Sequence, residues 1–321
     1  LTSSQTHAHL LVDTEVDGVG YGGSLRIDLD MADVGVDRNG GGLRPGGIDF
    51  GGTHGGEMTM DSVRVYSAPM NYFASVNDPV KRASNSYFTV GSLSASANRF
   101  VKSNVEFTNT EFRVIEQAGA TAYAAIHSYP TGDTGGRLSF RRCRFSLDPA
   151  IKTNNPSMVC EVFRANASIS PDAELNGGMV YEFADCEQIG NWDTGVNIVQ
   201  GGTVTWSGGV VRALTGFSVT STAGRPAQLT LSGQINLAAR VTALLNTPAQ
   251  ATQTGSYVRF DNVRWSRYCP AGATLVLYPV HGSYAFEVDG PPTTNLSAIR
   301  GSRCVRRPGL GASGGLGVQE W

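Results

Sequence analysis

The sequence is poor in charge, especially lysine, and it has no long apolar run. Charged residues make up 16% of the 321 residues, and lysine occurs only at Lys81, Lys102 and Lys152. The formal net charge of −2 provides no electrostatic footprint for a polyanion, so we expect no nucleic-acid partner. No segment approaches the roughly 20 apolar residues that cross a bilayer, so we expect no membrane insertion.

Other signals are also missing. The five cysteines, at positions 143, 160, 186, 269 and 304, match no zinc or redox spacing, so we expect reduced thiols, no metal and no cofactor. The chain begins LTSSQTHAHL, without an initiator Met or a signal-peptide pattern, and we expect it to be a fragment of a longer protein. Hydrophobic residues nevertheless make up 40% of the chain, which is enough for a sizeable core.

An eight-residue pattern recurs along the chain. The segment VRFDNVRW, residues 258–265, alternates apolar and polar residues but breaks the alternation at Asp261 and Asn262. The template is h-x-h-x-(Asn/Asp/Gly/Ser)-x-x-h, where h is apolar, and seven other windows fit it: 29–36, 58–65, 105–112, 138–145, 181–188, 204–211 and 229–236. The h-x-h part predicts a short strand with one buried face, and the small polar residue predicts a sharp corner.

The spacing of these copies indicates the fold. They recur at intervals of 23 to 47 residues, and two of the longer intervals leave room for a further copy. One strand and one corner per turn predicts an all-β, right-handed, single-stranded parallel β-helix with loop insertions. An antiparallel sandwich or barrel is the alternative, but it would show turns every 8 to 12 residues or so. We expect residues 1–265 to form the β-helix and residues 266–321 a small C-terminal β module.

Stacked turns would align equivalent positions in columns about 4.8 Å apart. The third template position would form a buried apolar column of Met31, Met60, Phe107, Phe140, Phe183, Trp206, Leu231 and Phe260. Cys143 and Cys186 would lie in adjacent turns, as buried reduced thiols or, alternatively, as a disulfide. The seventh position would form a solvated ladder of alternating charge, with Arg64, Glu111, Arg144 and Glu187.

Segments such as LRIDLDMADVGVD, VEFTNTEFRV and LSFRRCRFSLD resemble the rungs of bacteriophage tailspikes and related β-helical polysaccharide-active proteins. The resemblance covers roughly residues 25–265 and rests on architecture. It implies the C-terminal part of a homotrimer of the virion tail that binds, and often cleaves, the O-antigen or capsule of a host bacterium. The signature motifs of polygalacturonase-like enzymes, pectate lyases and alginate epimerases are absent.

A polysaccharide groove across stacked turns would use outward-facing carboxylates. Glu106 and Glu182 occupy the second template position two recognised copies apart, so their backbones would lie about 10 Å apart. Such a spacing is compatible with an inverting glycosidase, whose carboxyl groups are about 6.5 to 9.5 Å apart. One carboxyl would protonate the leaving oxygen while the other activates water. A solvated Glu on a sheet face is the alternative interpretation.

Weaker candidates lie elsewhere. Glu57 and Asp61 form a second possible catalytic group, with His54 as a sugar contact, because Gly55 and Gly56 would let the backbone approach a sugar closely. For a lyase, the base would be His127 or Tyr129, and Arg137 or Arg141 would neutralise a uronate carboxylate. A hydrolase is favoured over a lyase, and a non-enzymatic adhesin or a structural fibre is the competing class. The site could also lie between subunits or on a missing N-terminal part.

Overall fold

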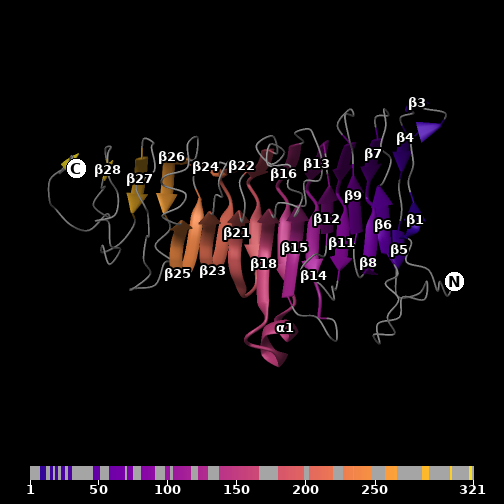
Figure 1. Cartoon of the computed structure of the whole chain (residues 1–321), viewed down its shortest axis with the longest axis horizontal. Coiled ribbons are helices and arrows are strands. Elements are labelled where there is room, and N and C mark those ends of the chain that lie inside the picture. The colour runs from indigo at the N-terminus through magenta and orange to yellow at the C-terminus, as the bar shows by residue number, and fades with distance from the viewer. Residues whose placement is uncertain are drawn as a thin grey trace, which may run out of the picture.

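The strands of this computed structural model form two large parallel sheets of 15 and 10 strands. The structure describes the backbone of the strands and turns given below, and the side chains of residues 61–64, 82–89, 105–116, 122–128, 137–165, 180–198, 202–218, 228–233 and 235. The strands are stacked along the longest axis of the molecule, from the indigo N-terminal strands to the yellow C-terminal ones (Figure 1). The prediction of an all-β fold with parallel strands is confirmed.

The 10-stranded sheet contains the h-x-h segments. Its strands, in spatial and chain order, are β4 (Gly23–Leu25), β7 (Met58–Asp61), β10 (Lys81–Ser84), β13 (Asn104–Thr108), β16 (Arg137–Arg141), β19 (Val180–Ala184), β22 (Gly202–Ser207), β24 (Ala227–Ser232), β26 (Tyr257–Trp265) and β27 (Tyr284–Val288). Each strand therefore pairs with the equivalent strand of the preceding and the following turn.

The 15-stranded sheet has two arms that meet at a single long strand, β23 (Val210–Val219). The first arm follows the corners and contains β5 (Asp28–Asp30), β8 (Arg64–Ala68), β11 (Tyr87–Val90), β14 (Glu111–Val114), β17 (Arg144–Leu147) and β20 (Glu187–Ile189). The second arm contains β1 (Ala8–Leu11), β6 (Gly46–Phe50), β9 (Asn71–Ala74), β12 (Asn98–Val101), β15 (Ala122–Ser128), β18 (Val159–Ala165) and β21 (Trp192–Ile198). Finally, β25 (Asn236–Asn246) pairs with β23.

One turn therefore consists of a strand of the 10-stranded sheet, a corner, a strand of the first arm and a strand of the second arm. In the turn that begins at β13, these strands are β13, β14 and β15, and β16 then pairs with β13. The same order recurs in the turns that begin at β16 and β19. Equivalent residues of successive turns consequently lie side by side in columns.

The inner column, defined as the third template position, forms the centre of the core. Phe107, Phe140, Phe183 and Trp206 are all at most 1% exposed. Their rings stack nearly parallel, with centroid distances of 5.5 Å, 5.0 Å and 4.6 Å from one pair to the next. Burying such rings contributes roughly 1.5 to 3 kcal/mol each, with a further 0.5 to 1.5 kcal/mol or so per aromatic pair. The predicted continuous apolar column is confirmed for these residues.

The register corrects two details of the predicted repeat. In the first turn Leu25, not Met31, lies beside Met60, so the window 29–36 is wrong. The 47-residue interval between Met60 and Phe107 contains one further copy, residues 81–88, whose Ala83 pairs with both neighbours. The 43-residue interval between Phe140 and Phe183 contains none, because these two residues pair directly.

Part of that long interval is an insertion with a short helix, α1 (Pro149–Asn154), which projects from the side of the stack (Figure 1). Asp148 begins the helix by accepting a hydrogen bond from the Ala150 backbone at 3.0 Å. Lys152 forms an ion pair of 2.6 Å with Asp193. The same Asp193 oxygen accepts a 2.7 Å bond from the Cys160 backbone, so the insertion is fixed to β18 and β21. With six residues, α1 is far too short to span a membrane.

The chain ends contribute little described structure. Two short antiparallel pairs join β2 (Glu15–Val16) to β3 (Val19–Gly20) and β28 (Cys304–Val305) to β29 (Val318–Gln319). β27 extends the 10-stranded sheet past residue 265 by pairing in parallel with β26. The proposed boundary between residues 265 and 266 stays a prediction, because residues 266–283 lie outside the described part of the chain.

Candidate functional site

The corner column, defined as the fifth template position, has the backbone geometry that the sequence predicts. Its members all have φ between 51° and 69°: Ser62, Asn85, Asn109, Arg142, Asp185, Gly208 and Gly233. Left-handed backbone is uncommon outside glycine, and Asn and Asp tolerate it best because their side chains can form local hydrogen bonds. In the first six of these corners the backbone N–H donates to a carbonyl of the following turn, for example Asn109 to Arg141 at 2.9 Å. The corner is therefore part of the stacked ladder.

Polar side chains reinforce the first three corners. The Asp61 carboxylate accepts hydrogen bonds of 2.7 Å from both the Ser84 hydroxyl and the Asn85 amide. The Asn85 carbonyl oxygen in turn accepts a 2.8 Å bond from the Asn109 amide. Three successive turns are thus joined by side chains along the outside of the corner.

The sixth template position points into the interior and holds a small donor in four consecutive turns. Ser86, Thr110, Cys143 and Cys186 each donate to the carbonyl two residues earlier, at 2.8, 3.1, 3.4 and 3.5 Å. Both cysteines are buried free thiols, which confirms the preferred prediction over a disulfide. Burial, reinforced by the neighbouring Cys143, raises the pKa of the Cys186 thiol well above its usual value. Cys186 is consequently a structural thiol.

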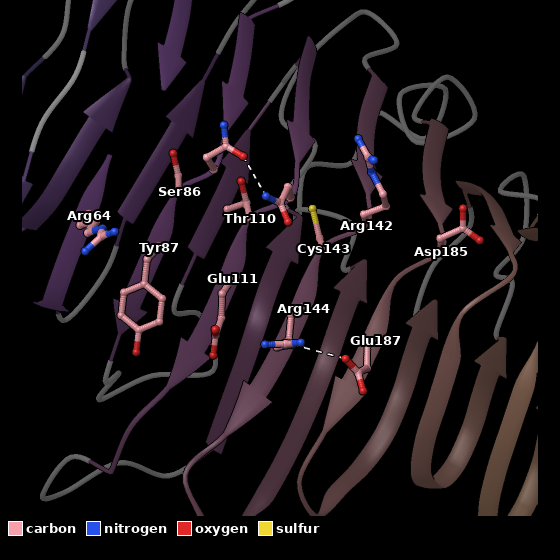
Figure 2. A pocket seen from close by; sticks show the side chains of 12 residues that line it. Arg64, Ser86, Tyr87, Thr110, Glu111, Arg142, Cys143, Arg144, Asp185 and Glu187 are labelled. Atoms are coloured by element: carbon pink, nitrogen blue, oxygen red, sulfur yellow. Dashed lines mark hydrogen bonds and ion pairs between the residues drawn. The ribbon is translucent and has the colours of Figure 1, made fainter. Parts of the chain in front are cut away.

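A groove of about 450 Å³ runs along the outside of these corners. We call it the corner groove. One edge consists of the corner residues Asn85, Asn109, Arg142 and Asp185, and the other of the ladder column at the seventh position, Arg64, Tyr87, Glu111, Arg144 and Glu187. Ser86, Thr110 and Cys143 complete the lining. Figure 2 shows Arg142 and Asp185 along one edge and Tyr87, Glu111, Arg144 and Glu187 along the other.

The groove follows the stacking direction and not a single turn. Its lining comes from five consecutive turns, which a 4.8 Å repeat spreads over roughly 19 Å. Three arginines and three carboxylates give the lining no formal net charge. Such a shape and composition suit an extended polar ligand, because each of the five turns contributes at least one amide, carboxylate or guanidinium group.

The residues of the ladder column are register partners from turn to turn along the groove. One of them, Tyr87, was not predicted from the sequence. Tyr87 pairs with Arg64 on one side and with Glu111 on the other. Arg144 forms an ion pair of 3.3 Å with Glu187, while Glu111 accepts a 2.7 Å hydrogen bond from the Ser146 hydroxyl. The predicted alternation of charge is therefore interrupted by the partly exposed ring of Tyr87.

The predicted catalytic pair lies on a different face. Glu106, Ser139 and Glu182 occupy adjacent turns, so the two carboxylates are two steps apart as expected. Each carboxylate already has a cationic partner: Arg82 lies 3.2 Å from Glu106, and Arg137 donates two hydrogen bonds to Glu182, the longer 2.9 Å. Neither glutamate lines the corner groove.

The remaining predicted residues are dispersed. Asp61 belongs to the corner ladder described above, and Arg141 is exposed at the end of β16 beside the groove. Arg137 is the partner of Glu182. His127 is 1% exposed, which leaves no access for a polymer to a base at this position. His54, Glu57 and Tyr129 lie outside the described residues.

A second polar cluster lies on the other arm of the 15-stranded sheet, and the sequence did not single it out. Glu161, which is 5% exposed, accepts a hydrogen bond of 3.0 Å from Arg164 and one of 2.5 Å from Asn197. His127, Arg164 and Asn197 are register partners in three successive turns. The cluster joins three strands, and its buried carboxylate is already satisfied by two donors.

Tyr87 and Asn85 escaped detection because their copy of the repeat begins with Lys81 and has Ala83 in the inner column. The signal that could have found them is spacing: the 47-residue gap divides into steps of 23 and 24, close to the regular intervals elsewhere. The groove itself has no sequence signature, because it depends on how the corner backbone separates two outward-facing columns.

A comparison of the chain with protein families, curated proteins and solved structures finds no match. Within the described part of the chain, no group of three or more His, Cys, Asp or Glu side chains is arranged to hold a metal ion.

Proposed function

We propose that the chain binds an extended bacterial surface polysaccharide, O-antigen or capsule, along the corner groove. The observation that carries this proposal is the uninterrupted lining of one groove by five stacked turns. A polymer of repeating sugars presents hydroxyl groups at regular intervals, and the groove presents Asn85, Asn109 and charged side chains at regular intervals too. Tyr87 offers a ring against which the apolar face of a sugar can pack.

We also propose a finer architecture and setting. The three-strand turns and their parallel register favour a right-handed, single-stranded parallel β-helix. The resemblance of the rungs to phage tailspikes supports a homotrimer exposed on the virion tail. End turns of a stacked fold expose unpaired backbone groups that other chains can pair with, and association in a trimer protects such edges. Sedimentation equilibrium tests the oligomeric state: we expect a particle mass three times the chain mass of 34.0 kDa.

The binding proposal is tested by biolayer interferometry against purified O-antigens and capsular polysaccharides. We expect at least one to bind, and Tyr87→Ala to weaken that binding about tenfold, because stacking is worth roughly 1 to 1.5 kcal/mol. Tyr87→Phe is the matched control, since it keeps the ring and removes the hydroxyl, and we expect it to bind within twofold of the unmodified protein. Equal binding by Tyr87→Ala would place the polysaccharide outside the groove.

Cleavage of the same polymer is a second candidate function. Glu111 and Glu187 both line the groove and are two turns apart, with Arg144 between them. Two stacking steps separate their backbones by about 9.6 Å, close to the carboxyl separation of about 6.5 to 9.5 Å in inverting glycosidases. Glu106 and Glu182 have the same spacing but do not line the groove. All four carboxylates already have a polar or cationic partner. We therefore favour binding alone, and the groove pair over the face pair if the polymer is cut.

An assay for new reducing ends, with absorbance of unsaturated uronates read in parallel, separates a hydrolase, a lyase and a non-enzymatic adhesin. For a hydrolase that uses the groove, Glu111→Gln and Glu187→Gln would each abolish the reducing ends, whereas Glu106→Gln and Glu182→Gln would retain them. The reverse pattern would restore the face pair as the catalytic one. No product from any bound polysaccharide is the outcome that we expect for an adhesin.

A further inference from the structure

Arg142 occupies a backbone position that does not suit arginine. Its φ of 51° is left-handed, and all other corner residues with described geometry are Ser, Asn, Asp or Gly. An Asn here would be less strained, and its amide could extend the ladder that already joins Asp61, Asn85 and Asn109. Local backbone strain of this kind concentrates at functional sites, so it motivates a search for a function.

The guanidinium of Arg142 differs from its neighbours in its contacts. The turn from Arg137 to Leu147 has four arginines, and two of them are paired with carboxylates of the next turn: Arg137 with Glu182, and Arg144 with Glu187. For the exposed guanidinium groups of Arg141 and Arg142, the described residues provide no hydrogen-bond acceptor or carboxylate partner. Arg142 lines the corner groove, and Arg141 directly precedes it in the chain.

These two features leave one arginine of the groove without an ion pair among the described residues, although the lining as a whole has no formal net charge. Glu187 offsets Arg144 within the lining, while Arg142 projects from the opposite edge (Figure 2). A guanidinium is planar, stays charged at every physiological pH, and binds carboxylates and phosphates through two parallel hydrogen bonds. Neutral sugar hydroxyls do not require such a group, because amide side chains can bind them.

We propose that Arg142, with Arg141 beside it, binds an anionic substituent of the polysaccharide in the corner groove, a uronate carboxylate or a phosphate. The inference rests on the proposed function and narrows its ligand to an acidic polysaccharide. The spacing of anionic groups along such a polymer would fix the register in which it lies across the five turns. Arg142 therefore destabilises the backbone locally, and in return it places a guanidinium where it can bind an anionic group.

The test uses the full chain and the polysaccharide that binds best in a panel of alginate, hyaluronan, purified acidic O-antigens and capsules, and neutral dextran. We expect that ligand to be acidic. Its carboxyl-reduced form and its dephosphorylated form identify which substituent is bound, since only removal of the correct one should weaken binding. Arg142→Asn is expected to weaken binding at least about tenfold, as for loss of a charged hydrogen-bonded pair. Arg142→Lys keeps the charge without the fork and should give an intermediate loss.

Arg212→Asn is the matched control. Arg212 is an exposed arginine of β23 that does not line the groove, so its replacement removes the same charge and should change binding less than twofold. Thermal melts exclude misfolding, and we expect Arg142→Asn to melt no lower than the unmodified protein. The inference is overturned, while the proposed function stands, if the best ligand is neutral or if Arg142→Asn binds it as tightly. If no polysaccharide binds at all, the proposed function and this inference fall together.

Discussion

At the scale of single residues, the left-handed backbone and the limited space of the corner restrict which side chains can occupy it. Gly208 and Gly209 follow one another with φ of 66° and 74°. A Cβ on Gly209 would lie 2.1 Å from the Cys186 carbonyl oxygen and 2.7 Å from the Cys186 backbone nitrogen. At Gly233, whose φ is 69°, the nearest atom would be 3.4 Å away. Gly209 and Gly233 therefore both require left-handed backbone, but only Gly233 has room for a Cβ atom.

This difference allows strain and crowding to be separated. We expect Gly209→Ala to lower the free energy of unfolding by about 2 to 4 kcal/mol, because backbone atoms must move apart as well as adopt a strained φ. Gly233→Ala introduces the strain alone and should lower it by about 1 kcal/mol. Urea denaturation monitored by tryptophan fluorescence measures both values. Equal losses at the two positions would mean that adjacent turns do not approach as closely at Gly209 as described.

At the scale of elements, stability comes from columns that continue from strand to strand. Phe140 of β16 stacks on Phe107 of β13 and on Phe183 of β19, and it is fully buried. Three strands therefore share one aromatic contact surface, while their backbones share ladder hydrogen bonds. In a stacked fold each strand contacts mainly its neighbours, so a break in the column affects the strands on both sides.

We expect Phe140→Ala to lower the free energy of unfolding by about 3 to 5 kcal/mol, because it leaves a cavity between two rings. Phe140→Leu is the matched variant: it keeps most of the buried volume, loses the ring stacking, and should cost less than half as much. Urea denaturation of the two variants gives the comparison. A loss below 1 kcal/mol for Phe140→Ala would contradict the continuous aromatic column.

The elements also show what could be predicted from the sequence. The corner geometry and most of the inner column follow from alternation and small polar residues, which act locally. The first copy was placed wrongly because Leu25, Ile27, Leu29 and Met31 alternate with polar residues, so several registers satisfy the same pattern. The copy at residues 81–88 was missed because its inner position is an alanine, which gives a weak apolar signal; the strand is nevertheless paired with both neighbouring turns.

At the scale of the whole molecule, the candidate site depends on relations that no single window of sequence contains. Repeat spacing predicts that Glu106 and Glu182 lie two turns apart, but not that Arg82 and Arg137 pair with them. It predicts the ladder column without Tyr87, and it does not predict that this column and the corner column enclose a groove. The groove results from five turns in register, so a single turn cannot form it.

The most direct test of the account is a crystal structure of the protein with a bound oligosaccharide from the best-binding polysaccharide. We expect the sugar chain to lie parallel to the stacking axis in the corner groove, with a ring against Tyr87 and an acidic group at Arg142. A sugar chain lying across the face of Glu106 and Glu182, or crossing the stack at a single turn, would contradict the proposed site.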